Sequence, residues 1–65
     1  MKETIPLLEK LIKTAQGTEL DLRKFEHGNS AAGVRVRRVM QNIRAQARNI
    51  RTEIQEIRKL RKEND

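Results

Sequence analysis

The amino-acid sequence predicts an all-α protein, an antiparallel hairpin of two helices that forms one domain over residues 1–65. Three observations predict this fold. Apolar residues recur at helical spacing before and after a single break at residues 27–30. The break contains Gly28 and Asn29, residue types that are common where one helix ends and the next begins. The break is also short, and a short connection makes two helices antiparallel neighbours.

The first helix is expected from about residue 4 to residue 26. Thr4 is a suitable N-cap residue, and Pro6 is tolerated within the first turn. The apolar side chains cover an arc of about 160°, which is wider than a seam between two helices requires. Gly17 interrupts the helix at a cost of about 1 kcal/mol relative to alanine, and it marks either a close helix approach or a kink. The candidate core residues of this helix are Leu8, Leu11, Ala15, Leu22 and Phe25.

The second helix is expected from about residue 30 to residue 62, with Asn29 or Ser30 as its N-cap. Its apolar residues recur at intervals that alternate between four and three, which is the heptad spacing of a coiled coil. This helix is about 50 Å long at about 1.5 Å per residue, so it extends beyond the first. Its candidate core residues are Val36, Met40, Ile43, Ala47, Ile50, Ile54 and Ile57.

The width of the first apolar arc and the length of the second seam together predict self-association. A chain of 65 residues buries only a small core, and disulfides, metals or partner chains commonly stabilise such chains. The sequence has no cysteine and a single histidine, His27, so it offers neither a disulfide nor a cluster of metal-binding side chains. We therefore expect a homodimer that forms a four-helix bundle, or a higher homo-oligomer built as a coiled-coil assembly.

Positive charge is concentrated in the second half of the chain. Residues 1–32 contain five basic and five acidic side chains, whereas residues 33–65 contain ten basic and four acidic ones and so carry the whole net charge of +6. No acidic residue lies between Glu26 and Glu53. Such a block predicts a polyanionic partner, either nucleic acid, an anionic membrane or an acidic protein.

The arginines of the second helix form a ridge beside the heptad seam. When Val36 is placed at heptad position d, the next residue and every seventh residue after it is an arginine, at position e, and neighbours in this column lie about 10 Å apart. Arginine outnumbers lysine in this helix, and a guanidinium group can bind two phosphate oxygens at once. The candidate nucleic-acid-binding residues are Arg35, Arg37, Arg38, Arg44, Arg48, Arg51 and Arg58.

Contact with the phosphates of duplex DNA, without sequence preference, is the simplest interpretation of this ridge. Stacking on single-stranded bases is not favoured, because the one aromatic residue, Phe25, belongs to the apolar face. Backbone contacts alone do not exclude RNA. Amide side chains near the ridge could read base edges, although amides on an exposed helical face are usually only solvated. These amides are Gln41, Asn42, Gln46 and Asn49.

The alternative function is a coiled-coil protein-interaction module. In that case the arginines would flank a coiled-coil interface and pair with carboxylates, either those of an acidic partner protein or those of the first helix. Glu9, Glu19 and Asp21 are the acidic residues of the first helix that could serve. Three carboxylates do not neutralise seven arginines, so excess positive charge would still face water or an anion.

The remaining functional classes find little support in the sequence. It contains no nucleophile paired with a base and no glycine-rich phosphate loop, so we expect neither an enzyme nor a cofactor nor a small-molecule substrate. It has no apolar run long enough to cross a bilayer, no signal-peptide pattern, and no Trp at the edge of the apolar stripe, so we expect no membrane association. These features favour a location in the cytoplasm.

Residues 27–59, HGNSAAGVRVRRVMQNIRAQARNIRTEIQEIRK, resemble the linker-histone-like family of chlamydiae and its short relatives in Bacteroidetes. The resemblance rests on GNSAAGVRVRR, residues 28–38, and on EIQEIRK, residues 53–59. It implies a nucleoid-associated protein that binds and compacts DNA. The chlamydial members carry a long lysine-rich tail, whereas this chain ends at Asp65, so DNA binding is expected to come from the helical hairpin itself.

Overall fold

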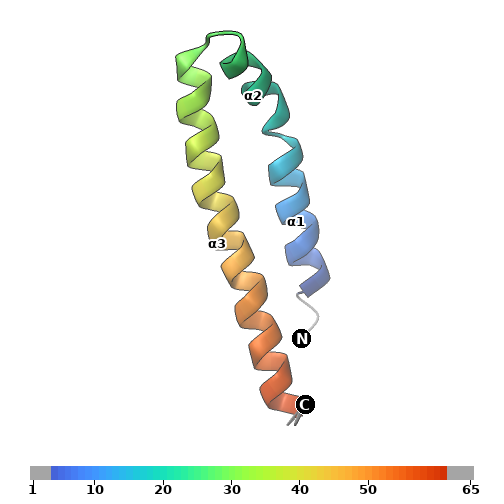
Figure 1. Cartoon of the computed structure of the whole chain (residues 1–65). Helices are drawn as coiled ribbons and strands as arrows, with labels where there is room; N and C mark the ends of the chain where they lie inside the picture. The colour runs from blue at the N-terminus through green and yellow to red at the C-terminus, as the bar shows by residue number, and fades with distance from the viewer. Residues whose placement is uncertain (1–3, 62–65) are drawn as a thin grey trace.

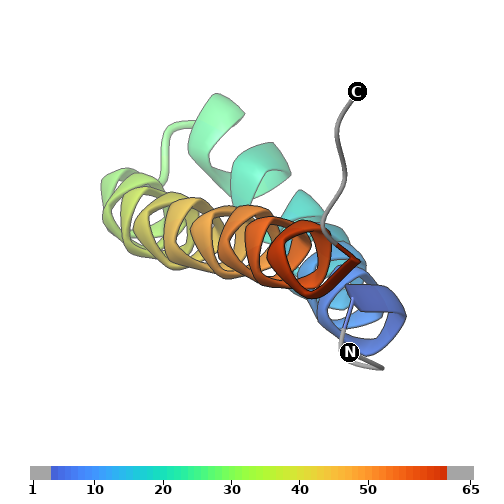
Figure 2. The same ribbon diagram turned by 90° about the horizontal axis from the view of Figure 1, so that it is seen from below.

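The computed structural model describes residues 4–61, which form an all-helical hairpin and confirm the predicted all-α class. Helix α1 spans Thr4–Gln16, α2 spans Glu19–Glu26 and α3 spans Ser30–Arg61. Helices α1 and α2 follow one another along one arm, and α3 forms the other arm (Figure 1). In the view of Figure 2, α2 and α1 lie on opposite sides of the line of α3, so the two arms cross at an angle. The predicted end of the second helix, residue 62, lies outside the described residues.

A bend at Gly17 and Thr18 divides the first arm, where the sequence predicted one continuous helix. The amide of Thr18 donates to the carbonyl oxygen of Ala15, three residues back, at 3.1 Å, and its hydroxyl donates to the carbonyl oxygen of Thr14 at 2.9 Å. A threonine hydroxyl that occupies the carbonyl four residues back competes with the helical bond and bends the helix. A Cβ on Gly17 would meet only carbonyl oxygens of its own arm, so this glycine marks a kink and not a close approach to α3.

The turn between the arms has specific hydrogen bonds at both of its ends. The amide of Gly28 donates to the carbonyl oxygen of Phe25 at 2.9 Å, and that of Asn29 to the carbonyl oxygen of Lys24 at 3.0 Å. This is the Schellman pattern, which requires a left-handed residue, and Gly28 has φ +103°. The side-chain oxygen of Asn29 accepts a hydrogen bond from the amide of Ala32 at 3.1 Å, so Asn29 caps α3.

The two arms meet along a seam of facing residues, and both sides of this seam follow heptad spacing. The buried and half-buried residues of the first arm are Thr4, Leu7, Leu11, Thr14, Thr18 and Asp21. Those of α3 that face them are Ala32, Val36, Val39, Ile43, Gln46, Ile50, Glu53 and Ile57. In the heptad that places Val36 at d, these residues of α3 occupy positions g and d. Position a lies at the border of the seam, where Gly33 and Ala47 are half-buried and Met40 and Ile54 are exposed, although the sequence pattern had joined it to position d.

The predicted core residues divide into two groups in the single chain. One group is buried or half-buried and comprises Leu11, Val36, Ile43, Ala47, Ile50 and Ile57. The other group is exposed and comprises Leu8, Ala15, Leu22, Phe25, Met40 and Ile54. Ala32, at 0% exposure, Thr18, at 4%, and Gln46, at 8%, are among the most buried residues, and the apolar pattern did not identify them. Two of these three are polar, and alanine contributes little to such a pattern.

Near the turn, the ring of Phe25 lies directly against Gly33 of α3. A Cβ built on Gly33 would lie 2.6 Å from Cδ1 and 2.8 Å from Cε1 of the ring, well inside van der Waals contact. The close approach between the arms that a glycine permits is therefore at Gly33 and not at Gly17. This contact sets how α2 lies on the first turns of α3.

Candidate nucleic-acid interface

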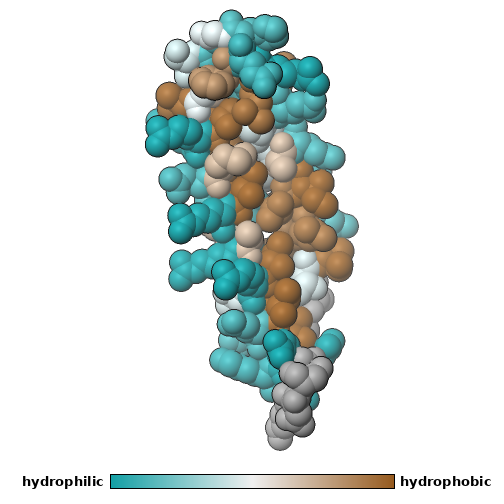
Figure 3. Space-filling view, in the orientation of Figure 1, coloured by the Kyte–Doolittle hydropathy of each residue, from teal (hydrophilic) through white to brown (hydrophobic). Residues whose placement is uncertain are grey.

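The arginine column at heptad position e runs along the outer edge of α3, away from the first arm. The 3.6-residue period places position e next to position a and on the far side from g, so the column borders the apolar surface without entering the seam. In Figure 3, hydrophilic side chains project along one edge of the hairpin, beside an apolar surface that runs over both arms. The residues of this column are Arg37, Arg44, Arg51 and Arg58, and all four are exposed.

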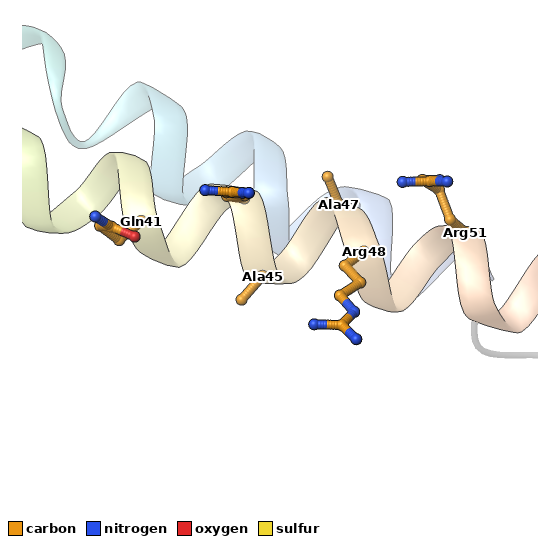
Figure 4. A pocket seen from close by; sticks show the side chains of 6 residues that line it. Gln41, Ala45, Ala47, Arg48 and Arg51 are labelled. Atoms are coloured by element: carbon orange, nitrogen blue, oxygen red, sulfur yellow. The ribbon is translucent and has the colours of Figure 1, made fainter.

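A shallow hollow of about 600 Å³ lies on the surface of α3 among three of the predicted arginines. Ala45 and Ala47 line it with small side chains that point to opposite sides of the helix (Figure 4). Figure 4 shows Ala47 and Arg51 on one side of the helix and Arg48 on the other, so the guanidinium groups border the hollow from two directions. Its lining residues are Gln41, Arg44, Ala45, Ala47, Arg48 and Arg51.

Most of these arginines have no carboxylate neighbour within the described part of the chain. Ion pairs join Arg23 to Glu19 at 2.7 Å and Lys59 to Glu56 at 3.9 Å. Among residues 4–61, no ion pair reaches five of the predicted DNA-binding residues, so their positive charge remains available to an external anion. These five are Arg37, Arg38, Arg44, Arg48 and Arg51.

Arg35 differs from the other predicted residues because it lies on the other flank of the seam and pairs with Asp21. Its Nε donates to Oδ2 of Asp21 at 3.1 Å, and its terminal nitrogen donates to Oδ1 at 3.0 Å. These two hydrogen bonds lower the pKa of Asp21 and raise that of Arg35. The sequence held a signal for this pair, because Asp21 and Arg35 lie seven residues before and after Gly28, at the same level of an antiparallel hairpin.

Gln46 does not lie on the exposed face, where the sequence analysis had placed it with the other amides. Its side chain is inside the seam, and its Nε2 donates to the hydroxyl of Thr14 at 3.2 Å. Its Oε1 is buried and has no hydrogen-bond partner. Gln46 therefore contributes to the contact between the arms and is not available for reading bases. Gln41, Asn42 and Asn49 are exposed, as expected.

Residues 4–61 lack two other kinds of site. Within residues 4–61, no three histidine, cysteine, aspartate or glutamate side chains gather in a way that could hold a metal ion. No helix of the same region combines the length and the apolar character that a membrane span requires. The arginine-rich edge of α3 is thus the surface with the most distinctive chemistry in the described hairpin.

A helical hairpin with an exposed arginine column on one edge defines a class of small proteins suited to binding polyanions. The chain matches the family described as histone H1-like protein Hc1 over residues 5–60, and it belongs to that family. This confirms the resemblance found in the sequence. The family is one of structural DNA-binding proteins of the bacterial nucleoid and not of enzymes. No curated protein and no solved structure matches the chain.

Proposed function

We propose that the protein binds duplex DNA without sequence preference through the arginine-rich edge of α3, and that it compacts or bridges DNA in the nucleoid. The observation that carries this proposal is the set of five exposed arginines that have no ion pair within residues 4–61. Membership of the histone H1-like family supports DNA as the polyanion. The arginine edge comprises Arg37, Arg38, Arg44, Arg48, Arg51 and Arg58.

The dimensions of this edge suit the backbone of a duplex. From Arg37 to Arg58 the column spans about 31 Å, because 21 residues each rise about 1.5 Å. One turn of B-DNA is about 34 Å long, so a column laid along the duplex spans nearly one turn. Arginines about 10 Å apart contact selected phosphates and leave the bases unread. The expected interaction is therefore electrostatic and independent of sequence.

Two further features support contact with a duplex backbone. Phe25 is the one aromatic residue of the chain, so the chain offers no series of aromatic rings on which successive single-stranded bases could stack. Arg35 shares its charge with Asp21 and is expected to contribute less than the arginines of the e column. Arg48 borders the hollow from a different side and widens the basic surface around α3.

A salt titration with matched triple variants tests this function. The first variant is Arg37→Gln/Arg44→Gln/Arg51→Gln. The control is Lys10→Gln/Lys13→Gln/Lys24→Gln, which removes the same charge from exposed positions of the first arm. Affinity for two unrelated duplexes would be measured over a series of salt concentrations. Each lost phosphate contact reduces the magnitude of the slope of log affinity against log salt by about 0.9. The slope of the arginine variant should therefore be smaller by up to about 2.7, and that of the control should change much less.

Three results would contradict the proposal. Equal losses for the two triple variants would show that net charge, and not the edge of α3, determines binding. Absence of binding to either duplex at low salt would remove DNA as the partner and favour the acidic-protein alternative. A strong preference for one of the two duplexes would contradict binding through phosphates alone.

A further inference from the structure

An apolar surface extends over both arms on the same side of the hairpin. In Figure 3 it runs along the length of the molecule and joins α1 and α2 to α3. On the first arm, Ile5, Leu8 and Ile12 are 62%, 43% and 43% exposed, and on α3, Met40 and Ile54 are 43% and 46% exposed. We call this surface the outer face, and its members are Ile5, Leu8, Ile12, Ala15, Leu22, Phe25, Gly33, Met40, Ala47 and Ile54.

The spacing of the outer face is that of a helix-packing surface. Along α1 the intervals between its residues are three, four and three, and along α3 they are seven throughout. Heptad spacing on two neighbouring helices produces a flat apolar surface that another helix pair of the same spacing can cover. A second copy of this hairpin carries such a surface, and a two-fold axis would bring the two faces together.

The two edges of the outer face differ in their charged residues. On the α3 side, the arginine column at position e borders the face. On the other side, the helical period places Glu9 next to Ile5 and Ile12 along the free edge of α1, with Lys13 one turn further along, and Glu19 and Glu26 of α2 follow Ile12 by seven and fourteen residues. Arg23 also lies on that edge, and its charge is paired with Glu19 at 2.7 Å. One edge is therefore purely basic, whereas the other carries the carboxylates of the face, Glu9 among them, together with Lys13 and Arg23.

These edges distinguish two ways of placing one outer face on another. With the two-fold axis parallel to the helices, both turns lie at the same end, and α3 of each copy covers the first arm of its partner. The arginine column of one copy then meets the edge of the other that carries Glu9. With the axis perpendicular to the helices, the turns lie at opposite ends and α3 covers α3. The two arginine columns would then meet, which like charges oppose.

The register of the hairpin identifies the charges that would meet. Thr14 and Gln46 lie at the same level, because their side chains are hydrogen-bonded at 3.2 Å. Glu9 precedes Thr14 by five residues, and Arg51 follows Gln46 by five. Since both helices rise about 1.5 Å per residue, Glu9 and Arg51 lie level on opposite edges of one hairpin. An axis parallel to the helices keeps this level and places Glu9 of one copy beside Arg51 of the other.

We propose that the outer face is a self-association surface on which two copies pack with their turns at the same end, and that Glu9 of each copy faces Arg51 of its partner. The two arginine edges then lie on opposite edges of a four-helix bundle. Each copy neutralises part of its partner's column near Arg51, whereas Arg38 and Arg48 point away from the partner. This inference does not rest on DNA binding and is tested without DNA.

The orientation can be measured without altering the outer face. The chain contains no cysteine, so His27→Cys, at an exposed turn position, carries a single spin label. Neighbouring helices pack at 8–10 Å, so turns at the same end should place the labels within about 30 Å of one another. Turns at opposite ends would separate them by about 40 Å, since Gly33 to Ile54 alone spans about 31 Å. A distance near 40 Å, or a monomer at all concentrations, would overturn the proposal.

A charge exchange tests the specific pair. Glu9→Arg and Arg51→Glu should each raise the dissociation constant of the dimer about tenfold, because each change affects two symmetry-related contacts. The combined variant should return to within about twofold of the native value. Glu56→Arg and Lys10→Glu are the matched controls, since both residues lie away from the outer face, and each should change the constant little. If the combined variant is weaker than either single variant, Glu9 and Arg51 do not face one another.

Discussion

The side-chain amide of Gln46 donates a hydrogen bond to the hydroxyl of Thr14, and this contact joins α3 to α1 in the middle of the seam between the arms. Thr14 in turn donates its hydroxyl hydrogen to the carbonyl oxygen of Lys10 at 3.0 Å, so it can accept from Gln46. The amide oxygen of Gln46 remains buried without a partner. A buried polar pair of this kind fixes the register of two helices at some cost in stability.

Replacement of Gln46 by leucine should therefore stabilise the hairpin by about 1 kcal/mol, because it removes a buried unpaired oxygen and fills the seam with apolar surface. The measurement is thermal unfolding followed by circular dichroism at one fixed protein concentration. Gln41→Leu, at an exposed position, is the control and should change the midpoint little. A lower midpoint for Gln46→Leu would show that the hydrogen bond to Thr14 outweighs the unpaired oxygen.

The contact between Gly33 and Phe25 predicts a coupling between two substitutions. Gly33→Ala gains about 1 kcal/mol of helix propensity, but its new methyl group collides with the ring of Phe25. In a Phe25→Ala background the collision is absent, so the full gain should appear there. In the native background the gain should be smaller or reversed. Unfolding free energies of the two single variants and the double variant measure this coupling, and equal gains in the two backgrounds would exclude it.

Two glycines should respond in opposite directions to the same substitution. Gly17→Ala should stabilise the first arm by up to about 1 kcal/mol, since its Cβ would make ordinary contacts of 3.5 and 3.7 Å and its φ is not left-handed. Gly28→Ala should destabilise the turn by about 1 kcal/mol, because alanine does not readily adopt φ +103°. Thermal unfolding of both variants provides the comparison. Destabilisation by Gly17→Ala would show that the bend requires glycine itself.

The pair between Asp21 and Arg35 predicts a pH dependence of stability. Hydrogen bonds from Arg35 lower the pKa of Asp21 in the folded protein, so the carboxylate favours the folded state. The stabilisation is fully present above the ordinary aspartate pKa of about 3.9, and it is lost as the pH falls through the lowered pKa of the folded state. Asp21→Asn should therefore lower the unfolding midpoint slightly at pH 7 and leave it unchanged in strong acid.

The matched control for this pair is Glu19→Gln. Its ion pair with Arg23 lies within α2 and does not join the two arms. The effect of the control at pH 7 should therefore be smaller than that of Asp21→Asn. If the unfolding midpoints of the native protein and Asp21→Asn still differ below the lowered pKa of Asp21, the charge of the carboxylate does not cause the difference.

The sequence by itself determined the helical hairpin. The turn depends on Gly28 and Asn29, whose backbone and side-chain preferences act locally and can be read without knowledge of the fold. The long helix follows from heptad spacing, which is also a local property. The arginine column at position e follows from the same spacing, because residues seven apart lie on one edge of a helix. The sequence alone therefore identifies the arginine column as a row of positive charges on one edge of the helix.

Only the tertiary structure decided which columns of α3 face the first arm. Positions a and d have the same alternating spacing as positions d and g, so the apolar period does not choose between them. The contact of Phe25 with Gly33 and the pair of Asp21 with Arg35 accompany a rotation of α3 that places Gln46 inside and Met40 outside. Such contacts join residues far apart in the chain, and a local pattern does not record them.

The sequence alone also did not determine the bend in the first arm, because the bend depends on tertiary packing. Gly17 alone was compatible with a kink or with a close approach, and the outcome depended on where the hydroxyl of Thr18 found its acceptor. In the fold, Thr18 is buried in the seam, and its hydroxyl bonds to the carbonyl oxygen of Thr14. Burial requires a polar group to find a partner, and burial is a property of the packed hairpin and not of the sequence around residue 18.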